Sequence, residues 1–157
     1  MYGSIVSGSP VTRWDAIVAA HGPLCDRLTY PYFGEPPAAY LSDGCTHAPD
    51  SIGPLAFLPA CAIHDWEYHA LTWSSTFAGP GRFGGTEADR AAADLRLCHN
   101  LLRSGAPWPV AAAFWKAVRV AGIGSYAYAP AAKPGRLGRV WIWIVSILVA
   151  PPKEVPA

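Results

Sequence analysis

The stretch from residue 58 to residue 71, LPACAIHDWEYHAL, constrains the fold more than any other part of the chain. On a helix, four of its chemically active side chains fall at positions i, i+3, i+4 and i+7 and therefore share one face: Cys61, His64, Asp65 and Tyr68. A buried helix face is normally apolar, because polar groups without partners are costly to bury. The stretch therefore predicts a helix that presents a base, a carboxylate and a phenol to a polar site.

Length and composition predict a single domain without a strong overall charge. A chain of 157 residues suits one core of ordinary size, expected over about 11–128 and followed by a C-terminal tail at 129–157. Charged residues make up 15% of the chain and the net charge is +1, which gives no indication of a nucleic-acid partner. The seven Trp residues suit either a core or a surface made for an apolar partner such as a bilayer interface.

Apolar periodicity and capping residues predict a mainly helical fold. Helices are expected over 13–20, about 57–73, 86–103 and 110–121. Thr12 is the expected cap of the first helix, Thr86 opens the third in Thr-Glu-Ala-Asp, and Gly105 ends it. Residues 22–57 are rich in Pro, Gly, Asp and Tyr without a sustained period, so we expect a long ordered loop, which is usually functional.

An apolar run, GRVWIWIVSILVA, occupies residues 138–150, between Arg136 and Pro151. A membrane-spanning helix needs about 20 apolar residues, so this segment is too short to span a bilayer. Its β-branched and aromatic residues favour a buried strand or a packing helix. The alternative is an interfacial segment or a segment that docks to a protein.

Hard oxygen ligands in the long loop and the central helix make calcium the favoured metal. Asp43, Asp50 and Asp65 offer carboxylates, and Gly44 offers a carbonyl that an ion can approach closely. Taken alone, Asp43 and Asp50 are also typical turn residues. The metal interpretation therefore depends on the whole pattern and on no single aspartate.

Other site chemistries have less support. The chain contains neither a GxSxG nucleophile motif nor a GxxxxGK[ST] phosphate loop. Five residues are potential zinc ligands: Cys61, His64, His69, Cys98 and His99. Because Cys98 and His99 point to different faces of their helix, and because no CxxC pair is present, zinc is the weaker choice.

The segments 43–50, DGCTHAPD, and 61–68, CAIHDWEY, resemble the calcium loop and the active-site helix of bacterial and fungal secreted phospholipases A2. The CxxHDxxY pattern is shared with the wider phospholipase A2 superfamily. Residues 89–93, DRAAA, resemble the start of the second long helix of the animal enzymes. The resemblance covers about 40–103 and implies two long antiparallel helices, an ordered calcium loop, a third packing helix and an apolar C-terminal segment.

This resemblance also implies roles for individual residues. His64 would be the general base that takes a proton from water, Asp89 would orient its ring, and Tyr68 would hydrogen-bond Asp89. The implied activity is calcium-dependent hydrolysis of the sn-2 ester of glycerophospholipids at a membrane surface.

The resemblance further implies a metal site and a disulfide. Calcium would be held by the carboxylates of Asp43 and Asp65 and by the carbonyl of Gly44. Cys45 and Cys61 would form the disulfide that ties the calcium loop to the catalytic helix. The two remaining cysteines, Cys25 and Cys98, could pair with each other, but free buried thiols are the favoured interpretation.

A second resemblance suggests a different context. The order HDxxY, then Ala-Asp at the head of a helix, then FWKAVRVAGIGSYAY at 114–128, is similar to small phage and prophage proteins. The N-terminus lacks a basic region followed by an apolar run, so no Sec signal is expected, and a released or virion-associated protein is favoured. The alternative function is a non-catalytic component of a phage-like particle that contacts a protein partner through 138–150. Retention of Asp43, His64, Asp65 and Asp89 favours the enzyme.

Overall fold

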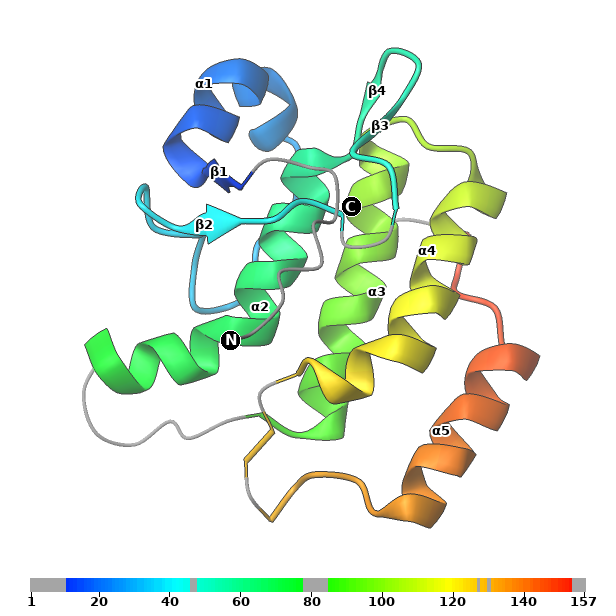
Figure 1. Ribbon diagram of the computed structural model, residues 1–157. Coiled ribbons are helices and arrows are strands. Elements are labelled where there is room, and N and C mark those ends of the chain that lie inside the picture. Colours follow the sequence, from blue (N-terminus) through cyan, green and yellow to red (C-terminus); the bar gives the residue numbers. More distant parts are fainter. Residues whose placement is uncertain (1–10, 46–47, 78–84, 127, 130, 154–157) are drawn as a thin grey trace, which may run out of the picture.

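The computed structural model describes residues 11–45, 48–77, 85–126, 128–129 and 131–153. The described chain is mainly helical (Figure 1). Its helices are α1 (Trp14–Cys25), α2 (Leu58–Phe77), α3 (Glu87–Arg103), α4 (Trp108–Ala121), the short 3-10 helix η1 (Gly122–Gly124) and α5 (Arg136–Leu148). Its strands are β1 (Thr12–Arg13), β2 (Leu41–Ser42), β3 (Ser51–Ile52) and β4 (Leu55–Ala56).

The four short strands form two separate antiparallel pairs. In the first, β1 pairs with β2 so that Thr12 lies opposite Ser42. In the second, β3 and β4 form a hairpin whose turn contains Gly53 at a φ of 56°, in the left-handed region. Of the segment expected as a loop over 22–57, residues 22–25 belong to α1. In the described remainder, β2 pairs with β1 just before α1, and β3 and β4 pair with each other.

The helices pack in sequence order, with α1 on α2, α2 on α3, α3 on α4 and α4 on α5 (Figure 1). One apolar cluster lies between α1, α2 and the following loop: Trp14, Ile17, Cys25, Leu28, Tyr40, Ala62, Ile63 and Trp66. A second joins α2, α3 and α4: Cys45, Phe57, Ala60, Cys61, Leu97, Cys98, Leu101, Ala106 and Ala111. These two clusters fix α2 against both neighbours.

The first helix differs from the one expected at 13–20. Thr12 does not cap it: Thr12 is paired with Ser42 in the β1–β2 ladder, and the residue at the cap position, Arg13, makes no side-chain cap. The helix runs on to Cys25 across a kink at His21, where φ is −132°, two residues before Pro23. Proline inside a helix lacks an N–H for the carbonyl four residues earlier and clashes with that carbonyl, so Pro23 favours a kink in the turn before it.

The starts of α3 and α4 coincide with a capping residue and with a proline. Thr86 caps α3 through a reciprocal capping box with Asp89, and Gly105 follows the helix at a φ of 90°. Helix α4 starts at Trp108 with Pro109 inside its first turn, two residues before the expected start at 110. Proline is well accommodated there because first-turn N–H groups have no helical partner.

The apolar run at 138–150 lies largely in α5, which packs on α4, so of the two expected alternatives the packing helix is confirmed and the buried strand is wrong. Within α5 only Ile142 and Ser146 are buried. Among the residues that the structure describes, no helix is long and apolar enough to cross a membrane.

Candidate functional site

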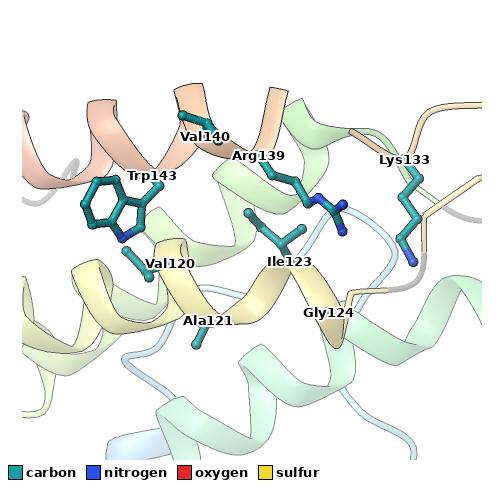
Figure 2. A pocket seen from close by; sticks show the side chains of 8 residues that line it. All are labelled: Val120, Ala121, Ile123, Gly124, Lys133, Arg139, Val140 and Trp143. Atoms are coloured by element: carbon teal, nitrogen blue, oxygen red, sulfur yellow. The ribbon is translucent and has the colours of Figure 1, made fainter. Parts of the chain in front are cut away.

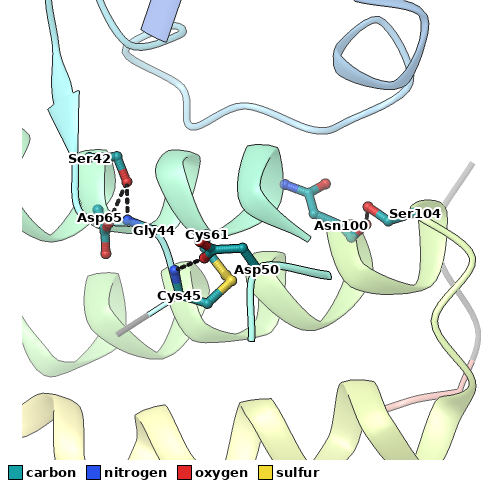
Figure 3. Close-up of a disulfide and its surroundings, with 8 residues drawn as sticks. All are labelled: Ser42, Gly44, Cys45, Asp50, Cys61, Asp65, Asn100 and Ser104. Carbon is teal, nitrogen blue, oxygen red and sulfur yellow. Dashed lines mark hydrogen bonds between the residues drawn. A yellow bond between two sulfur atoms is a disulfide. The ribbon is translucent and has the colours of Figure 1, made fainter. Parts of the chain in front are cut away.

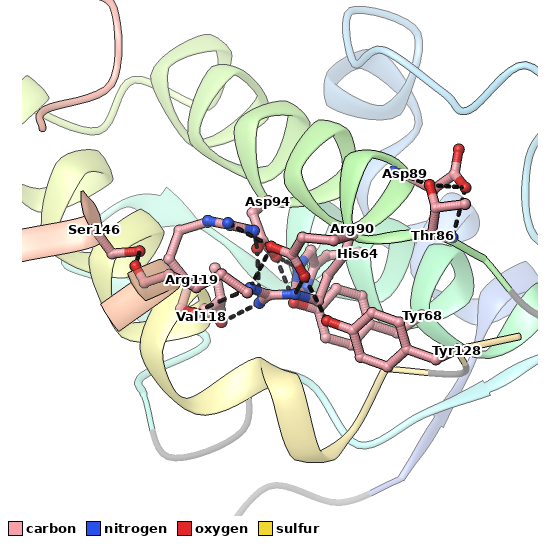
Figure 4. Close-up of polar contacts among 12 residues, drawn as sticks. His64, Tyr68, Thr86, Asp89, Arg90, Asp94, Val118, Arg119, Tyr128 and Ser146 are labelled. Carbon is pink, nitrogen blue, oxygen red and sulfur yellow. Dashed lines mark hydrogen bonds and ion pairs between the residues drawn. The ribbon is translucent and has the colours of Figure 1, made fainter. Parts of the chain in front are cut away.

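A buried histidine–aspartate pair lies between α2 and α3. His64 Nε2 is 2.9 Å from Asp94 Oδ1, and both side chains are buried. The ring of Tyr68, one turn further along α2, lies 4.2 Å from the His64 ring, and its hydroxyl donates to the same Asp94 oxygen at 2.5 Å (Figure 4). No described residue is bonded to the other imidazole nitrogen of His64, Nδ1. That nitrogen is therefore the one left for a water or a substrate.

The opposite oxygen of Asp94 is held by two arginines. Arg90 Nη1 donates to Asp94 Oδ2 at 3.2 Å, and Arg119 Nη1 donates to it at 3.0 Å. Asp94 thus receives hydrogen bonds on both oxygens from three different helices. A fully buried carboxylate with such partners is fixed in orientation, and its charge is compensated.

A second acidic residue closes this network from the head of α3. Glu87 accepts from both Nε and Nη2 of Arg90 at 2.9 Å, from Arg119 Nη2 at 2.6 Å and from the hydroxyl of Tyr128 at 2.5 Å. Arg90 also donates to the carbonyls of Val118 and Arg119 at the end of α4. The cluster therefore ties the end of α4 to the pair at His64.

Asp89 is not the partner of His64, which corrects the sequence interpretation. Its carboxylate accepts from the backbone N–H of Thr86 at 2.7 Å and from the Thr86 hydroxyl at 2.8 Å, at the exposed head of α3 (Figure 4). A helix turns about 100° per residue, so Asp89 and Asp94 point in different directions. Tyr68 likewise bonds Asp94 and not Asp89.

Burial and hydrogen bonding shift the pKa values of this pair. Burial lowers the pKa of His64, but the hydrogen bond and the charge of Asp94 outweigh it, and the pKa is raised above its ordinary value. Burial and the neighbouring Asp94 raise the pKa of the Tyr68 hydroxyl. Tyr68 is therefore a neutral hydrogen-bond donor across the physiological range.

The expected calcium ligands lie together beside this pair. Asp65, on α2, accepts at Oδ2 from the hydroxyl of Ser42 at 2.8 Å, and the same hydroxyl oxygen accepts from the backbone N–H of Gly44 at 3.1 Å. Burial raises the pKa of Asp65 to about 7, and the charge of Asp43 and a hydrogen bond with its side chain add to that effect. A buried carboxyl beside a second carboxylate is a place that a cation would stabilise.

Gly44 sits at a position that accepts no side chain (Figure 3). Its φ is 78°, and a Cβ there would lie 2.4 Å from Asp50 Oδ1. That same Asp50 oxygen accepts from the backbone N–H of Cys45 at 2.7 Å, while the Asp50 carbonyl accepts from the N–H groups of Phe57 and Leu58. Asp50 therefore shapes the loop.

A disulfide between Cys45 and Cys61 links this loop to α2, as expected (Figure 3). The other two cysteines, Cys25 and Cys98, are buried and free, in agreement with the favoured interpretation.

The donor set fits calcium better than zinc. Cys61 is a disulfide cysteine and is not available as a zinc ligand. Within the described part of the chain, no group of three or more His, Cys, Asp or Glu side chains is arranged to hold a metal. A calcium site in the loop would combine the two carboxylates of Asp43 and Asp65 with carbonyl oxygens and water, which is the usual ligand chemistry of that ion.

Sequence reasoning missed Asp94, Arg90, Arg119 and Ser42. A signal for Asp94 was present: the Thr86-x-x-Asp89 capping box already occupies Asp89, which leaves Asp94 as the other aspartate of that helix. Arg90 precedes Asp94 by four residues, the spacing of a helical ion pair. Arg119 and Ser42 come from distant segments, and no local pattern points to them.

Comparison of the chain with family models, with curated proteins and with solved structures found no match.

Proposed function

We propose that the protein is a calcium-dependent phospholipase A2 that hydrolyses the sn-2 ester of glycerophospholipids. The observation that carries this proposal is the hydrogen bond of 2.9 Å between His64 Nε2 and the buried Asp94, which leaves Nδ1 for the reacting water. The resemblance of 43–50 and 61–68 to phospholipases A2 supplies the reaction class, and α2, α3 and the loop would form a phospholipase A2-like core. In this proposal Asp94 replaces Asp89 as the orienting carboxylate.

The proposed chemistry needs one base and one positioned carboxylate. Neutral His64 accepts a proton from water at Nδ1 while the water oxygen attacks the ester carbonyl carbon. Asp94 holds the other ring nitrogen as an N–H donor and stabilises the imidazolium that forms. The same imidazolium then gives its proton to the leaving glycerol oxygen as the ester bond breaks, which releases a fatty acid and a lysophospholipid.

Asp43, Asp65 and the carbonyl of Gly44 are the residues that would hold calcium. When bound, the ion would supply positive charge to the substrate phosphate and to the oxygen on which charge develops. Ser42 keeps Asp65 oriented, and the disulfide at Cys45 keeps the loop against α2. These contacts support a loop whose shape is set before an ion binds.

The proposal is tested by fatty-acid release from a short-chain phosphatidylcholine that is present as monomers. A monomeric substrate separates the chemistry from any binding of the protein to a membrane. Wild type should release the sn-2 fatty acid in the presence of calcium and lose that activity with a chelator. His64→Gln keeps the size of the side chain but removes the base, so it should reduce the rate to background.

A matched control and a refuting outcome complete the experiment. His21 lies at the kink of α1, and His21→Gln should retain wild-type activity. No release by a protein that is folded by circular dichroism and binds calcium would refute the hydrolase. That result would favour the alternative, a non-catalytic component of a phage-like particle.

A further inference from the structure

The outward face of α5 is a continuous apolar surface. Leu137, Trp141 and Leu148 are 85%, 67% and 78% exposed. With Ile144 they are spaced at i, i+4, i+7 and i+11, so they form one stripe along the helix. Exposed patches of several large apolar residues in a row are uncommon on soluble proteins and mark interaction sites.

The opposite face of α5 is already used for packing. Ile142 and Ser146 are buried, and the Ser146 hydroxyl donates to the Ile142 carbonyl at 2.6 Å. From α4, Lys116 donates to the carbonyl of Ile147 at 3.1 Å and so holds the end of α5. These contacts fix the rotation of α5 about its own axis, and in that orientation the apolar stripe faces away from the protein.

A groove with two cations lies across the helix from this stripe, on the side of α5 that faces α4, because Arg139 is at i, i+3 and i+7 with the buried Ile142 and Ser146. Between α4, η1 and α5 lies a hollow of about 370 Å³ with a largely apolar wall that includes Ile123 and Trp143 (Figure 2). Lys133 and Arg139 also line it, and neither forms an ion pair with any described residue. A hollow with cations at one side and an apolar wall suits a group that is anionic at one end and apolar at the other.

Charge is strongly segregated along the chain, although the net charge is only +1. Residues 95–153 contain eight Lys and Arg and no Asp or Glu, whereas residues 1–94 contain ten Asp and Glu and four Lys and Arg. Arg96 and Arg119 of the basic segment are paired with acids of α2 and α3. The cations around α5 lack such partners within their own segment, and they complement an anionic surface.

We propose that α5 lies flat on an anionic phospholipid bilayer, with its apolar stripe inserted and with Lys133 and Arg139 reaching the lipid phosphates from the groove side of the helix. At 13 residues, α5 is only about 20 Å long, which suits an interfacial and not a spanning helix. Trp side chains favour the headgroup region, and each Lys or Arg near an anionic surface strengthens binding. The inference goes beyond the proposed catalysis and does not depend on it.

The test is flotation of the full chain with lipid vesicles in the presence of a calcium chelator, so that no calcium bridge contributes. Vesicles of phosphatidylcholine with phosphatidylglycerol should carry the protein upward, and pure phosphatidylcholine vesicles should carry much less. Added salt should weaken the binding, because it screens charges at the surface. Leu137→Ser and Trp141→Ser should each weaken it about tenfold, since each removes an inserted apolar side chain.

Charge variants and matched controls separate α5 from other surfaces. The double variant Lys133→Gln/Arg139→Gln should weaken binding roughly thirtyfold, at about fivefold for each charge. Ile52→Ser in the β3–β4 hairpin and Arg27→Gln after α1 also change exposed residues, and these two should bind as wild type does. All of these positions lie on the surface, so the variants should fold normally.

Three outcomes would overturn the inference. Binding that ignores the α5 variants would place the lipid contact elsewhere on the chain. Equal binding to neutral and anionic vesicles would remove the role of the cations. A dimer in solution that Leu137→Ser dissociates would show that a second copy covers the stripe. Fatty-acid release from monomeric substrate is unaffected by any of these results, so the two proposals can fail separately.

Discussion

Substituting Gly122 by alanine should disturb the pair formed by His64 and Asp94, although Gly122 is far from both residues in the sequence. A Cβ at Gly122 would lie 2.4 Å from the hydroxyl oxygen of Tyr68 and 3.0 and 3.1 Å from Cε2 and Cζ of its ring. Gly122 has helical dihedrals, with φ at −68° and ψ at −14°, so alanine incurs no backbone strain there. The whole effect should therefore come from the collision with Tyr68.

The expected magnitude follows from how firmly Tyr68 is held. Its hydroxyl bonds Asp94 at 2.5 Å, and its ring packs edge-on against Tyr126 at 5.1 Å. Overpacking of a filled site costs about 1–3 kcal/mol. A hydrogen bond to a charged group is worth about 1.5–3 kcal/mol, of which only part would be lost. We therefore expect Gly122→Ala to lower the free energy of unfolding by about 2 kcal/mol.

Urea denaturation measures this loss, and Gly124→Ala is the control. Gly124 lies in the same short 3-10 helix, but a Cβ there would meet nothing within 4 Å. Its substitution should leave stability unchanged or raise it by up to about 1 kcal/mol, because alanine restricts the unfolded chain. Repeating Gly122→Ala in a Tyr68→Phe background removes the atom at 2.4 Å, so the loss should shrink by at least about 0.5 kcal/mol.

Two results would refute this reasoning. If Gly122→Ala were as stable as Gly124→Ala, the collision would be relieved without cost. If Gly122→Ala cost the same in the Tyr68→Phe background as in wild type, the hydroxyl would not be the group displaced. Because Tyr68 and His64 share one oxygen of Asp94, the proposed fatty-acid release should fall together with stability in Gly122→Ala and not in Gly124→Ala.

Three further predictions concern other parts of the site. Asp94→Asn should reduce the rate of fatty-acid release by roughly 10³–10⁴-fold, as loss of an orienting carboxylate does. Asp89→Asn should keep that rate and lower the free energy of unfolding by about 0.5–1 kcal/mol, because it weakens the cap of α3. Rates of release and urea midpoints distinguish the two variants. Removing the disulfide with Cys45→Ser/Cys61→Ser should lower the free energy of unfolding by about 3 kcal/mol, measurable by calorimetry. Although burial raises the pKa of Glu87, its bonds from Arg90, Tyr128 and Arg119 lower it overall, so Glu87 stabilises the fold fully above its ordinary pKa of 4.5. That contribution is lost as pH falls through the lower folded value, so wild type and Glu87→Gln should differ in unfolding free energy at neutral pH and converge in acid.

Local sequence patterns predicted much of the backbone and part of the site. The helix that carries His64 and Tyr68, the cap at Thr86 and the disulfide between Cys45 and Cys61 are all present in the structure. The first two depend on interactions within a few residues, which periodicity and capping rules describe well. The disulfide came from the resemblance of two motifs and not from spacing.

The misassigned carboxylate shows where local rules stop. Asp89 lies at the head of a helix, but Thr86 already binds its carboxylate, and Asp94 faces His64 from about one and a half turns further on. Which aspartate faces α2 depends on the rotation of α3 about its axis, and apolar packing of residues such as Leu97 and Leu101 sets that rotation. Such a rotation is a tertiary property that a motif does not contain.

For the tail, a packing helix was one of the expected alternatives, but the extent of its exposure was not expected, for a related reason. An apolar run is normally buried because burial removes it from water, and that rule favoured a buried segment at 138–150. In the structure α5 packs mainly on α4, and most of its large apolar side chains are exposed. Sequence alone indicates that such a segment needs an apolar partner, but it does not say whether that partner is the protein's own core or another surface.

The proposed general-base role of His64 gives the charged cluster around Asp94 a reason that stability alone does not supply. Buried ion pairs lose much of their solvation, and apolar residues of similar volume often serve a helical core equally well. Here Asp94, Arg90, Arg119 and Glu87 occupy the junction of α3 and α4, where leucines would satisfy packing. What leucines would not provide is an acceptor that fixes His64 Nε2, with arginines that compensate its charge from the far side. The arrangement orients a histidine at one nitrogen and leaves the other for a water, which is the requirement of a general base.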